Sequence, residues 1–445
     1  MVKNETVESE KEKIIDDIEA QEINEDKLAA LKAKINKGNN MPPKILDKKT
    51  RSIRLGVLGS GQAGGRLAQT FFDLGYPAVA INTATQDLEH IKLPEDNKYL
   101  LQYGLGGAAK ELEIGKEAAE AHKDSIRELV ELKLNDAQVL LFCVSLGGGS
   151  GAGSVETVID VLATTGKPVV VITVLPMSNE DAQTKSNAVE TLSKLSKEVQ
   201  NKRIHNLVVV DNARIETIYS DVSQMDFFDV SNKAIVDPID VFNRYSSMPS
   251  SVKGLDPMEW AKLLTDSSGL SVYGEMVVPN YEEDTAIAEA VINSLSSGLL
   301  ASGFDLKQSK YVGVLIIANK SVWSKIPSTS VSYAMSMIGE AAGAPQGIFK
   351  GMYSSEEMKD DVVKVYSFFG GLGLPDSRIQ QLKKDAQELI AKSKTKDAER
   401  NLTLKLDTGV DDTTSAADKI RAKIAQKKSA FGGLVGASVQ DRRKK

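Results

Sequence analysis

The chain has 445 residues, of which 41% are hydrophobic and 26% charged, a composition typical of a globular protein with room for two or three domains. No apolar run approaches the roughly 18–20 residues that cross a bilayer, and the acidic, polar N-terminus is unlike a secretory signal. The lone cysteine, Cys143, excludes an intramolecular disulfide, and the three scattered histidines argue against a zinc site built by the protein. We therefore expect a cytoplasmic protein.

Residues 1–50 form a highly charged N-terminal extension. Isoleucine and leucine residues recur there at helical spacing until the Pro42-Pro43 breaker, which predicts one or two amphipathic helices. No catalytic chemistry is visible in this extension, and docking on a neighbouring subunit is one role open to it.

The first glycine loop follows a predicted strand, Arg54–Leu58, and precedes a predicted helix, Arg66–Leu74. Its pattern Gly59-Ser60-Gly61-Gln62-Ala63-Gly64-Gly65 is a GxGxxG, which by itself also fits a dinucleotide site. Such a site would place an acidic residue after the next strand, Ala78–Ile81, to hold a ribose hydroxyl. The chain has Asn82-Thr83-Ala84-Thr85-Gln86 there. This argues against NAD binding.

A second loop, Gly106-Gly107-Ala108-Ala109-Lys110, leads into a predicted helix, Lys116–Glu131. Taken alone, it is either a phosphate loop or a surface loop that caps this helix.

The third loop is the densest in glycine. A predicted buried strand, Ala137–Ser145, leads into Gly147-Gly148-Gly149-Ser150-Gly151-Ala152-Gly153, and a helix is predicted over Ser154–Leu162. Glycine lets the backbone approach a ligand closely, and the free N–H groups of a helix N-terminus favour an anion. Five glycines in seven residues exceed what a tight turn requires. The loop therefore predicts phosphate binding.

This third loop resembles the GGGTGSG signature of the tubulin/FtsZ superfamily, with Ser150 in the place of threonine, and it lacks the lysine of a Walker A loop. Gly61-Gln62-Ala63-Gly64 is similar to the GQAG of tubulin, the Asn82 loop to the NTxxQ of FtsZ, and the Lys110 loop to the TubZ branch. The resemblance implies GTP or GDP as ligand, with Mg²⁺ held by phosphates and water. It implies nucleotide contacts from Gly61, Gln62, Ala63, Asn82, Gly107, Ala108, Ala109, Lys110, Gly147, Gly148, Gly149, Ser150, Gly151 and Ala152, with Lys110 near the γ-phosphate.

Three further contacts are implied along the chain by the same resemblance. Glu180, after the predicted strand Val169–Leu175, takes the ribose position, while Asn212, after the predicted strand from Asn206, takes a guanine position. Asn232 takes the second guanine position at the start of a long central helix. Two amides can read the purine edge because each has both donors and an acceptor. Pro238 should kink or break that helix, or the helix should begin later.

The second half of the chain carries a DxxE motif, Asp256-Pro257-Met258-Glu259, which also reads as an N-terminal capping box. In the superfamily a similar pair of acids polarises the attacking water in the site of the next subunit, so the resemblance implies that Asp256 and Glu259 are catalytic. Interleaved helices and strands without glycine loops predict a smaller α/β domain here.

The fold class we expect is α/β, with a doubly wound parallel sheet in the GTP-binding domain. The expected order is an extension (1–50), a GTP-binding domain (51–230), a central helix (231–250), a second domain (251–375), a C-terminal helix (376–395) and a flexible basic tail (396–445). Residues 419–445 carry nine lysines and arginines and one acid, on a chain with net charge −6. Such a tail suggests a neighbouring subunit, DNA or a DNA-bound adaptor as partner, or a solubility role.

The resemblance to TubZ and the phage tubulins implies a GTPase that assembles head-to-tail into filaments and positions or segregates plasmid or phage DNA, without membrane attachment. The alternatives are a nucleotide-binding filament regulator that does not hydrolyse GTP, and a division protein like FtsZ.

Overall fold

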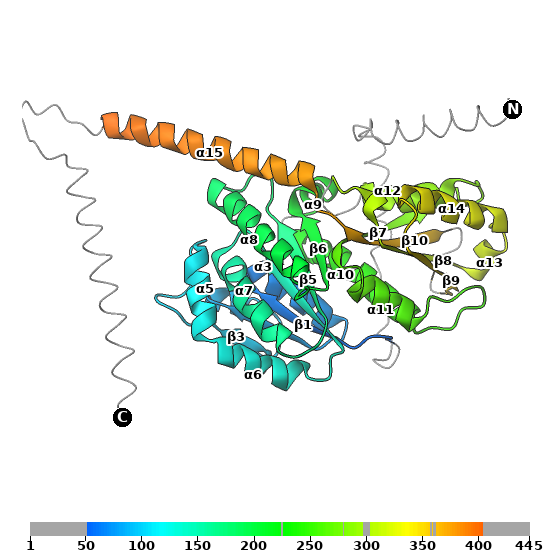
Figure 1. The fold of residues 1–445 in the computed structure, drawn as a ribbon, viewed down its shortest axis with the longest axis horizontal. Helices are drawn as coiled ribbons and strands as arrows, with labels where there is room; N and C mark the ends of the chain where they lie inside the picture. The colour runs from blue at the N-terminus through cyan, green and yellow to red at the C-terminus, as the bar shows by residue number, and fades with distance from the viewer. Residues whose placement is uncertain are drawn as a thin grey trace, which may run out of the picture.

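The computed structural model describes residues 51–403, apart from 224–225, 279, 297–302, 357 and 359–361. The predicted N-terminal extension and the basic segment 419–445 lie outside the described residues. One ten-stranded sheet runs through the molecule in the order β3-β2-β1-β4-β5-β6-β7-β10-β8-β9 (Figure 1). No helix among the described residues has the length and apolar character that a membrane span needs.

The first half is the predicted doubly wound domain. Its strands pair in parallel, and their burial from both sides explains why they read as continuous apolar runs. They are β1 (Leu55–Ser60), β2 (Ala78–Asn82), β3 (Lys98–Leu100), β4 (Val139–Ser145), β5 (Val169–Leu175) and β6 (Asn206–Asp211). The helices are α3 (Gly61–Asp73), α4 (Thr85–Glu89), α5 (Leu112–Ala121), α6 (Lys123–Leu134), α7 (Gly149–Ala163), α8 (Ala182–Gln200) and α9 (Asn212–Ile218), with a 3₁₀ turn η2 (Glu95–Asn97).

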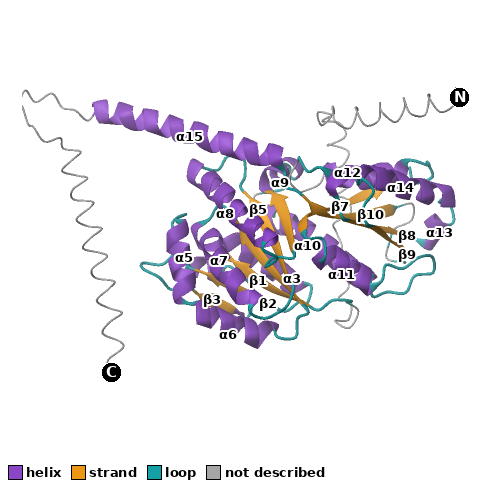
Figure 2. Ribbon diagram, in the orientation of Figure 1, coloured by secondary structure: helices purple, strands orange, loops and turns teal. Residues whose placement is uncertain are grey.

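The second half continues the same sheet. β7 pairs in parallel with β6 over three residues, Asn206–Val208, and β10 then pairs antiparallel with both β7 and β8. The strands are β7 (Gly269–Val278), β8 (Tyr311–Ala318), β9 (Gly347–Ser354) and β10 (Val363–Leu372). The helices are α11 (Pro257–Thr265), α12 (Ala286–Ser296), α13 (Lys320–Trp323) and α14 (Ser328–Ala341), with a 3₁₀ turn η3 (Leu306–Gln308). Helices cover the sheet throughout (Figure 2).

The central helix α10 (Phe227–Tyr245) differs from its prediction in both bounds. It begins four residues before Ser231, and it remains helical through Pro238 instead of breaking there. Proline removes one backbone donor, but the hydrophobic face of α10 is buried on both sides of it, at Ile235 and Ile239. Tertiary packing therefore overrides the local cost.

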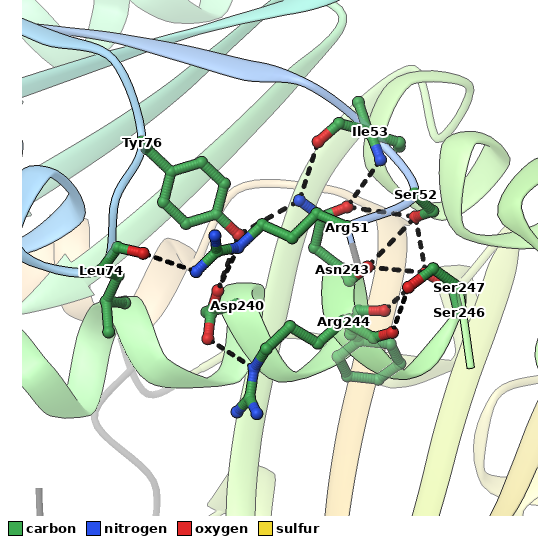
Figure 3. A network of polar contacts seen from close by, with 11 residues as sticks. Arg51, Ser52, Ile53, Leu74, Tyr76, Asp240, Asn243, Arg244, Ser246 and Ser247 are labelled. Carbon is green, nitrogen blue, oxygen red and sulfur yellow. Dashed lines mark hydrogen bonds and ion pairs between the residues drawn. The ribbon is translucent and has the colours of Figure 1, made fainter. Parts of the chain in front are cut away.

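A polar network fixes the C-terminal half of α10 at the edge of the sheet where the parallel strands begin (Figure 3). The side chain of Asn243 accepts from the N–H of Ile53 at 2.9 Å and donates to its carbonyl at 2.9 Å, just before β1 starts. Asp240 accepts from Arg51 Nε at 2.9 Å and from the Tyr76 hydroxyl at 2.8 Å. Burial, with the nearby Asp240 carboxylate, raises the pKa of Tyr76, which keeps its hydroxyl a donor.

Two other predicted helices have different bounds. The helix predicted over Lys116–Glu131 is split into α5 and α6 at His122, whose ring nitrogens lie 3.0 Å from the Tyr99 hydroxyl and 3.1 Å from the Gln102 carbonyl. The C-terminal helix α15 (Asp376–Thr403) continues past residue 395, where the flexible tail was predicted to start. Its first half packs on α8, and the rest extends beyond the body (Figure 1).

Candidate functional site

The three glycine loops of the sequence meet at the edge where the parallel strands end. Thr83, directly after β2, joins the second and third glycine loops: its N–H donates to Ser150 Oγ at 3.1 Å, and its carbonyl accepts from the N–H of Gly107 at 2.8 Å. The loop after β1 is equally close, since a Cβ on Gly61 would lie 3.0 Å from the backbone nitrogen of Gly151. The three glycine loops therefore lie together at this edge of the sheet.

The glycines of the third loop have two different surroundings. A Cβ on Gly153 would lie 2.4 Å from the Leu112 carbonyl oxygen, and one on Gly149 would lie 2.8 Å from the nitrogen of Glu111. A Cβ on Gly148 would meet nothing within 4 Å. Gly148 is also the N-cap of α7, with extended backbone and no side-chain cap. The tight glycines let α7 pack on α5, and Gly148 leaves the N-terminus of α7 open to an anion.

The second loop has a backbone that is unusual for residues other than glycine. Ala109 and Lys110 have positive φ values, of 46° and 65°. Such conformations are uncommon and are concentrated at ligand-binding sites. The loop is held by Asn187 of α8, whose Nδ2 donates to the carbonyls of Lys110 at 2.8 Å and Gly147 at 3.1 Å. The strained loop is thus tied to the third loop through one buried amide.

The ammonium of Lys110 forms an ion pair with Asp181, the N-cap of α8. Burial raises the pKa of Asp181, but hydrogen bonds from Lys110 and from Thr184 outweigh it and hold the pKa at about 2. Asp181 Oδ1 accepts from the N–H of Thr184 at 2.9 Å. Sequence reasoning placed Lys110 near a phosphate and missed both Asp181 and Asn187, although the N-cap position of Asp181 was a signal in the sequence.

Four predicted residues occupy the first turn of α3 and the end of β2. Gly61 is buried, Gln62 is exposed and Ala63 is half-buried. The side chain of Asn82 is buried and shapes its own turn: Oδ1 accepts from the N–H of Ala84 at 3.1 Å, and Nδ2 donates to Asp87 at 3.1 Å. The hydroxyl of Thr83 is buried with no hydrogen-bond partner among the described residues. A polar ligand at this edge could satisfy it.

The residues predicted for ribose and base lie after β5, after β6 and on α10. Glu180 Oε1 accepts from the N–H of Met177 at 3.0 Å and so closes its own loop. Asn212 is the first residue of α9 and is half-buried, while Asn232 is buried in the second turn of α10. Phe228, one turn before Asn232, was not predicted from the sequence. Its ring is partly exposed, and the Arg66 guanidinium lies 4.4 Å from the ring centroid. An aromatic face there could stack on a base.

The two predicted catalytic acids form a complete capping box. Asp256 Oδ1 accepts from the N–H of Glu259 at 2.8 Å, and Glu259 Oε2 accepts from the N–H of Asp256 at 3.0 Å. The start of α11 lies beside the end of α10, at the edge where the strands begin, since the N–H of Leu255 donates to the Tyr353 hydroxyl at 2.8 Å and the Tyr353 ring lies 4.9 Å from the ring of Tyr245, the last residue of α10. The acids therefore lie away from the edge that carries the glycine loops. The capping role is confirmed by this geometry.

The chemistry available at this edge is that of backbone N–H groups and a few side chains. Among the described residues, no group of three or more His, Cys, Asp or Glu side chains is placed to hold a metal ion. The N-terminus of α7 is open at Gly148, and the Lys110 loop is tied to the neighbouring Gly147 through Asn187. Together with a doubly wound sheet, this defines an α/β protein whose glycine loops suit a nucleotide's phosphates.

Comparison with known protein families agrees with a nucleotide-binding α/β fold. Residues 54–220 match the GTPase domain of the Tubulin/FtsZ family, and residues 245–383 match the C-terminal domain of TubZ-like members of that family. The chain belongs to the tubulin/FtsZ family.

Individual relatives cover most of the chain. The tubulin-like protein TubZ of Bacillus anthracis is 24% identical over 428 residues, which is 88% of this chain and 94% of the relative. CetZ of Pyrococcus abyssi is 24% identical over 328 residues, 72% of this chain and 86% of the relative. A GTPγS-form protofilament of TubZ from Bacillus thuringiensis serovar israelensis has a TM-score of 0.70 at 20% identity, covering 79% of this chain and 95% of that one. The predicted fold class and family are thereby confirmed.

Proposed function

We propose that this protein binds GTP and GDP, hydrolyses GTP and assembles head-to-tail into filaments. The observation that carries the proposal is the open N-terminus of α7 at Gly148, with the first and second glycine loops directly beside the third. A phosphate chain there would accept hydrogen bonds from backbone N–H groups without displacing any side chain. Family membership supports GTP as the nucleotide.

The part of the nucleotide that each site residue would contact follows from the place of that residue in the fold. Gly147–Ala152, Gly107–Ala109 and Gly61–Ala63 would surround the phosphates, with Lys110 leaving Asp181 to reach the γ-phosphate. Asn212 and Asn232 would read the guanine edge, and Phe228 would stack on the base. Mg²⁺ would be held mainly by phosphate oxygens and water, which suits an ion that keeps much of its hydration.

Hydrolysis would be completed by a second copy of the chain. Asp256 and Glu259 lie at the start of α11, at the edge of the sheet away from the glycine loops, so they cannot serve the nucleotide of their own subunit without a large rearrangement. Head-to-tail stacking would bring one subunit's acids to the next subunit's phosphates, where they would orient a water molecule. A heterologous contact of this kind extends into a filament. The protofilament and filament structures of TubZ relatives support this arrangement.

The cargo is proposed to be plasmid or phage DNA. A structurally similar TubZ, with a TM-score of 0.64 at 19% identity, is described as a type III plasmid segregation protein. The basic segment 419–445 would attach a DNA-bound adaptor, DNA itself or a neighbouring subunit. Removing it should leave GTP binding intact and weaken attachment.

Two substitutions at Asp256 separate capping from catalysis. Asparagine caps a helix about as well as aspartate, whereas alanine costs about 1 kcal/mol. Asp256→Asn should therefore keep the melting temperature and lose GTP hydrolysis by two orders of magnitude or more, with filaments that persist in pelleting assays. Asp256→Ala should lose both hydrolysis and stability.

Phosphate release and pelleting of the wild type should rise with protein concentration. Hydrolysis by Asp256→Asn at the wild-type rate would reduce Asp256 to a helix cap. A wild-type protein that neither pellets nor releases phosphate with GTP and Mg²⁺ would contradict the proposed function.

A further inference from the structure

The C-terminal helix α15 places a buried arginine against the strand ends that precede the ribose and base residues. Arg378 Nε lies 2.6 Å from Asp211 Oδ2, and Arg378 Nη2 lies 3.0 Å from Oδ1 of the same carboxylate. Both side chains are buried, with 10% and 2% of their surfaces exposed. This two-point contact fixes the orientation of the carboxylate as well as its position.

Asp211 is the link between this ion pair and the predicted guanine contact. It is the last residue of β6 and the N-cap of α9, and its Oδ1 accepts from the N–H of Ala213 at 3.2 Å. Asn212 lies between these two backbone positions, so the carboxylate sets the first turn of α9 on which Asn212 stands. Arg378 Nη2 also reaches the carbonyl of Pro176 at 3.4 Å, at the end of β5. One guanidinium therefore joins the ends of both strands.

Contacts other than the Arg378–Asp211 ion pair also hold α15 on the body of the protein. Leu382 and Ala386 are buried on the face that packs against α8, and Lys185 pairs with Asp385 at 3.6 Å. A buried ion pair adds little net stability compared with apolar packing, because both charges lose their hydration. What Arg378 adds beyond these contacts is a fixed geometry at the start of α9.

We propose that Arg378 is a positioning residue for base recognition: through Asp211 it places Asn212, and thereby sets the preference for guanine over adenine. The inference rests on the proposed function, since it assigns a role at that nucleotide site. It also makes α15 part of the nucleotide site, although no residue of α15 was expected there.

The test measures binding of GDP and of ADP to the full-length protein by competition with a fluorescent GDP analogue. Arg378→Gln should weaken GDP binding by about tenfold or more, as expected when a buried polar contact is misplaced, and leave ADP binding unchanged. Arg378→Lys keeps the positive charge and loses the two-point contact with the Asp211 carboxylate, so it should give a ratio of GDP to ADP affinity between those of the wild type and Arg378→Gln. Lys383→Gln removes an exposed charge from the same helix and should match the wild type.

A variant that leaves Asp211 buried and unpaired could lose its fold, so the double variant Asp211→Asn, Arg378→Gln accompanies it. Its two amides carry no buried charge, and it should fold with a reduced ratio of GDP to ADP affinity. Equal weakening of both nucleotides, or no change in either, would make Arg378 a tether of α15 and overturn the inference. A wild type that binds neither nucleotide would overturn the proposed function as well.

Discussion

Gly148 and Gly153 lie five residues apart at the start of α7, and their surroundings give them opposite sensitivities. Gly148 has extended backbone and open space, so a larger residue fits the fold and occupies the position proposed for a phosphate. A Cβ on Gly153 would collide with the backbone of α5. The sequence shows five glycines and cannot tell these two kinds apart.

Gly148→Leu should therefore keep the melting temperature of the wild type and abolish GTP binding. Gly153→Ala should lower stability, although alanine in an open helix interior would raise it by about 1 kcal/mol. Thermal unfolding and GTP titration of both variants check this contrast. Unimpaired GTP binding by a folded Gly148→Leu would place the phosphates elsewhere.

Asp237, on α10, is a carboxyl group with a displaced pKa. Burial, with repulsion from Glu275 and Asp240, raises the pKa to about 6, while Lys233 and Arg244 only partly oppose the shift. The native state then binds this proton more tightly than the unfolded chain, whose value is near 3.8. The contribution to stability is therefore present at low pH and is lost as the pH rises from about 4 to about 6.

Asp237→Asn should remove this dependence. We expect it to raise the free energy of unfolding by up to about 3 kcal/mol at pH 7.5 and by much less at pH 4.5. Urea denaturation of wild type and variant at the two pH values measures the difference. An equal effect at both would show that the asparagine acts through packing instead of charge.

At the scale of elements, α10 connects the two ends of the first domain. Its N-terminal turns carry Phe228 and Asn232, and its last turns are fixed to the start of β1 by Asn243 (Figure 3). Asn243 is completely buried and also donates to the Tyr76 hydroxyl at 3.1 Å. Removing it would leave several buried polar groups without partners.

Asn243→Ala should cost about 3 kcal/mol of unfolding free energy, the sum expected for stranding buried donors and acceptors. Ser247→Ala, which removes an exposed hydroxyl that donates to the Arg244 carbonyl at 2.7 Å at the solvent side of the network, should stay within about 0.5 kcal/mol of the wild type. Comparable losses in the two variants would contradict the role given to the network.

The elements that could be predicted from the sequence are those with strong local patterns. β4 and α7 follow from an apolar run next to dense glycine, and the span predicted for β5 has the observed bounds. β9 was not predicted, because a half-buried edge strand with glycine and lysine has no clear alternation. The break at His122 depends on Tyr99 and Gln102, which the helix pattern does not contain.

The same distinction holds within the candidate site. The loops were recognisable because each carries its glycines within a few residues. The contacts that hold these loops and the strand ends beside them could not be recognised in the sequence. Lys110 and Asp181 are 71 residues apart, and Asp211 and Arg378 are 167 residues apart. Nothing local in the sequence pairs such charges, because the fold alone brings them together.

At the scale of the whole molecule, the proposed nucleotide position and the proposed catalytic acids lie at different edges of one sheet. In such an enzyme each active site forms between two subunits: one subunit supplies the nucleotide position, and the next supplies the acids. GTP would then be hydrolysed only where two subunits meet, so the rate of hydrolysis would report how much of the protein has assembled.

Mixing two inactive variants tests this division. Asp256→Asn keeps its nucleotide position and lacks the acid, whereas Gly148→Leu keeps the acid and has its nucleotide position filled. In mixed filaments, a nucleotide on Asp256→Asn can face the intact Asp256 of a Gly148→Leu neighbour. With equal amounts and random order, about a quarter of the contacts would pair in this productive sense.

We therefore expect each variant alone to release little phosphate and the mixture to recover about a quarter of the wild-type rate, rising with total protein concentration. The control replaces Gly148→Leu by the double variant Gly148→Leu, Asp256→Asn, which supplies neither half and should restore nothing. Co-pelleting shows whether both chains enter the same filament. If both chains pellet together and phosphate release stays at the level of the control, Asp256 does not act on a neighbour's nucleotide, and the acids of α11 are confined to their role as a helix cap.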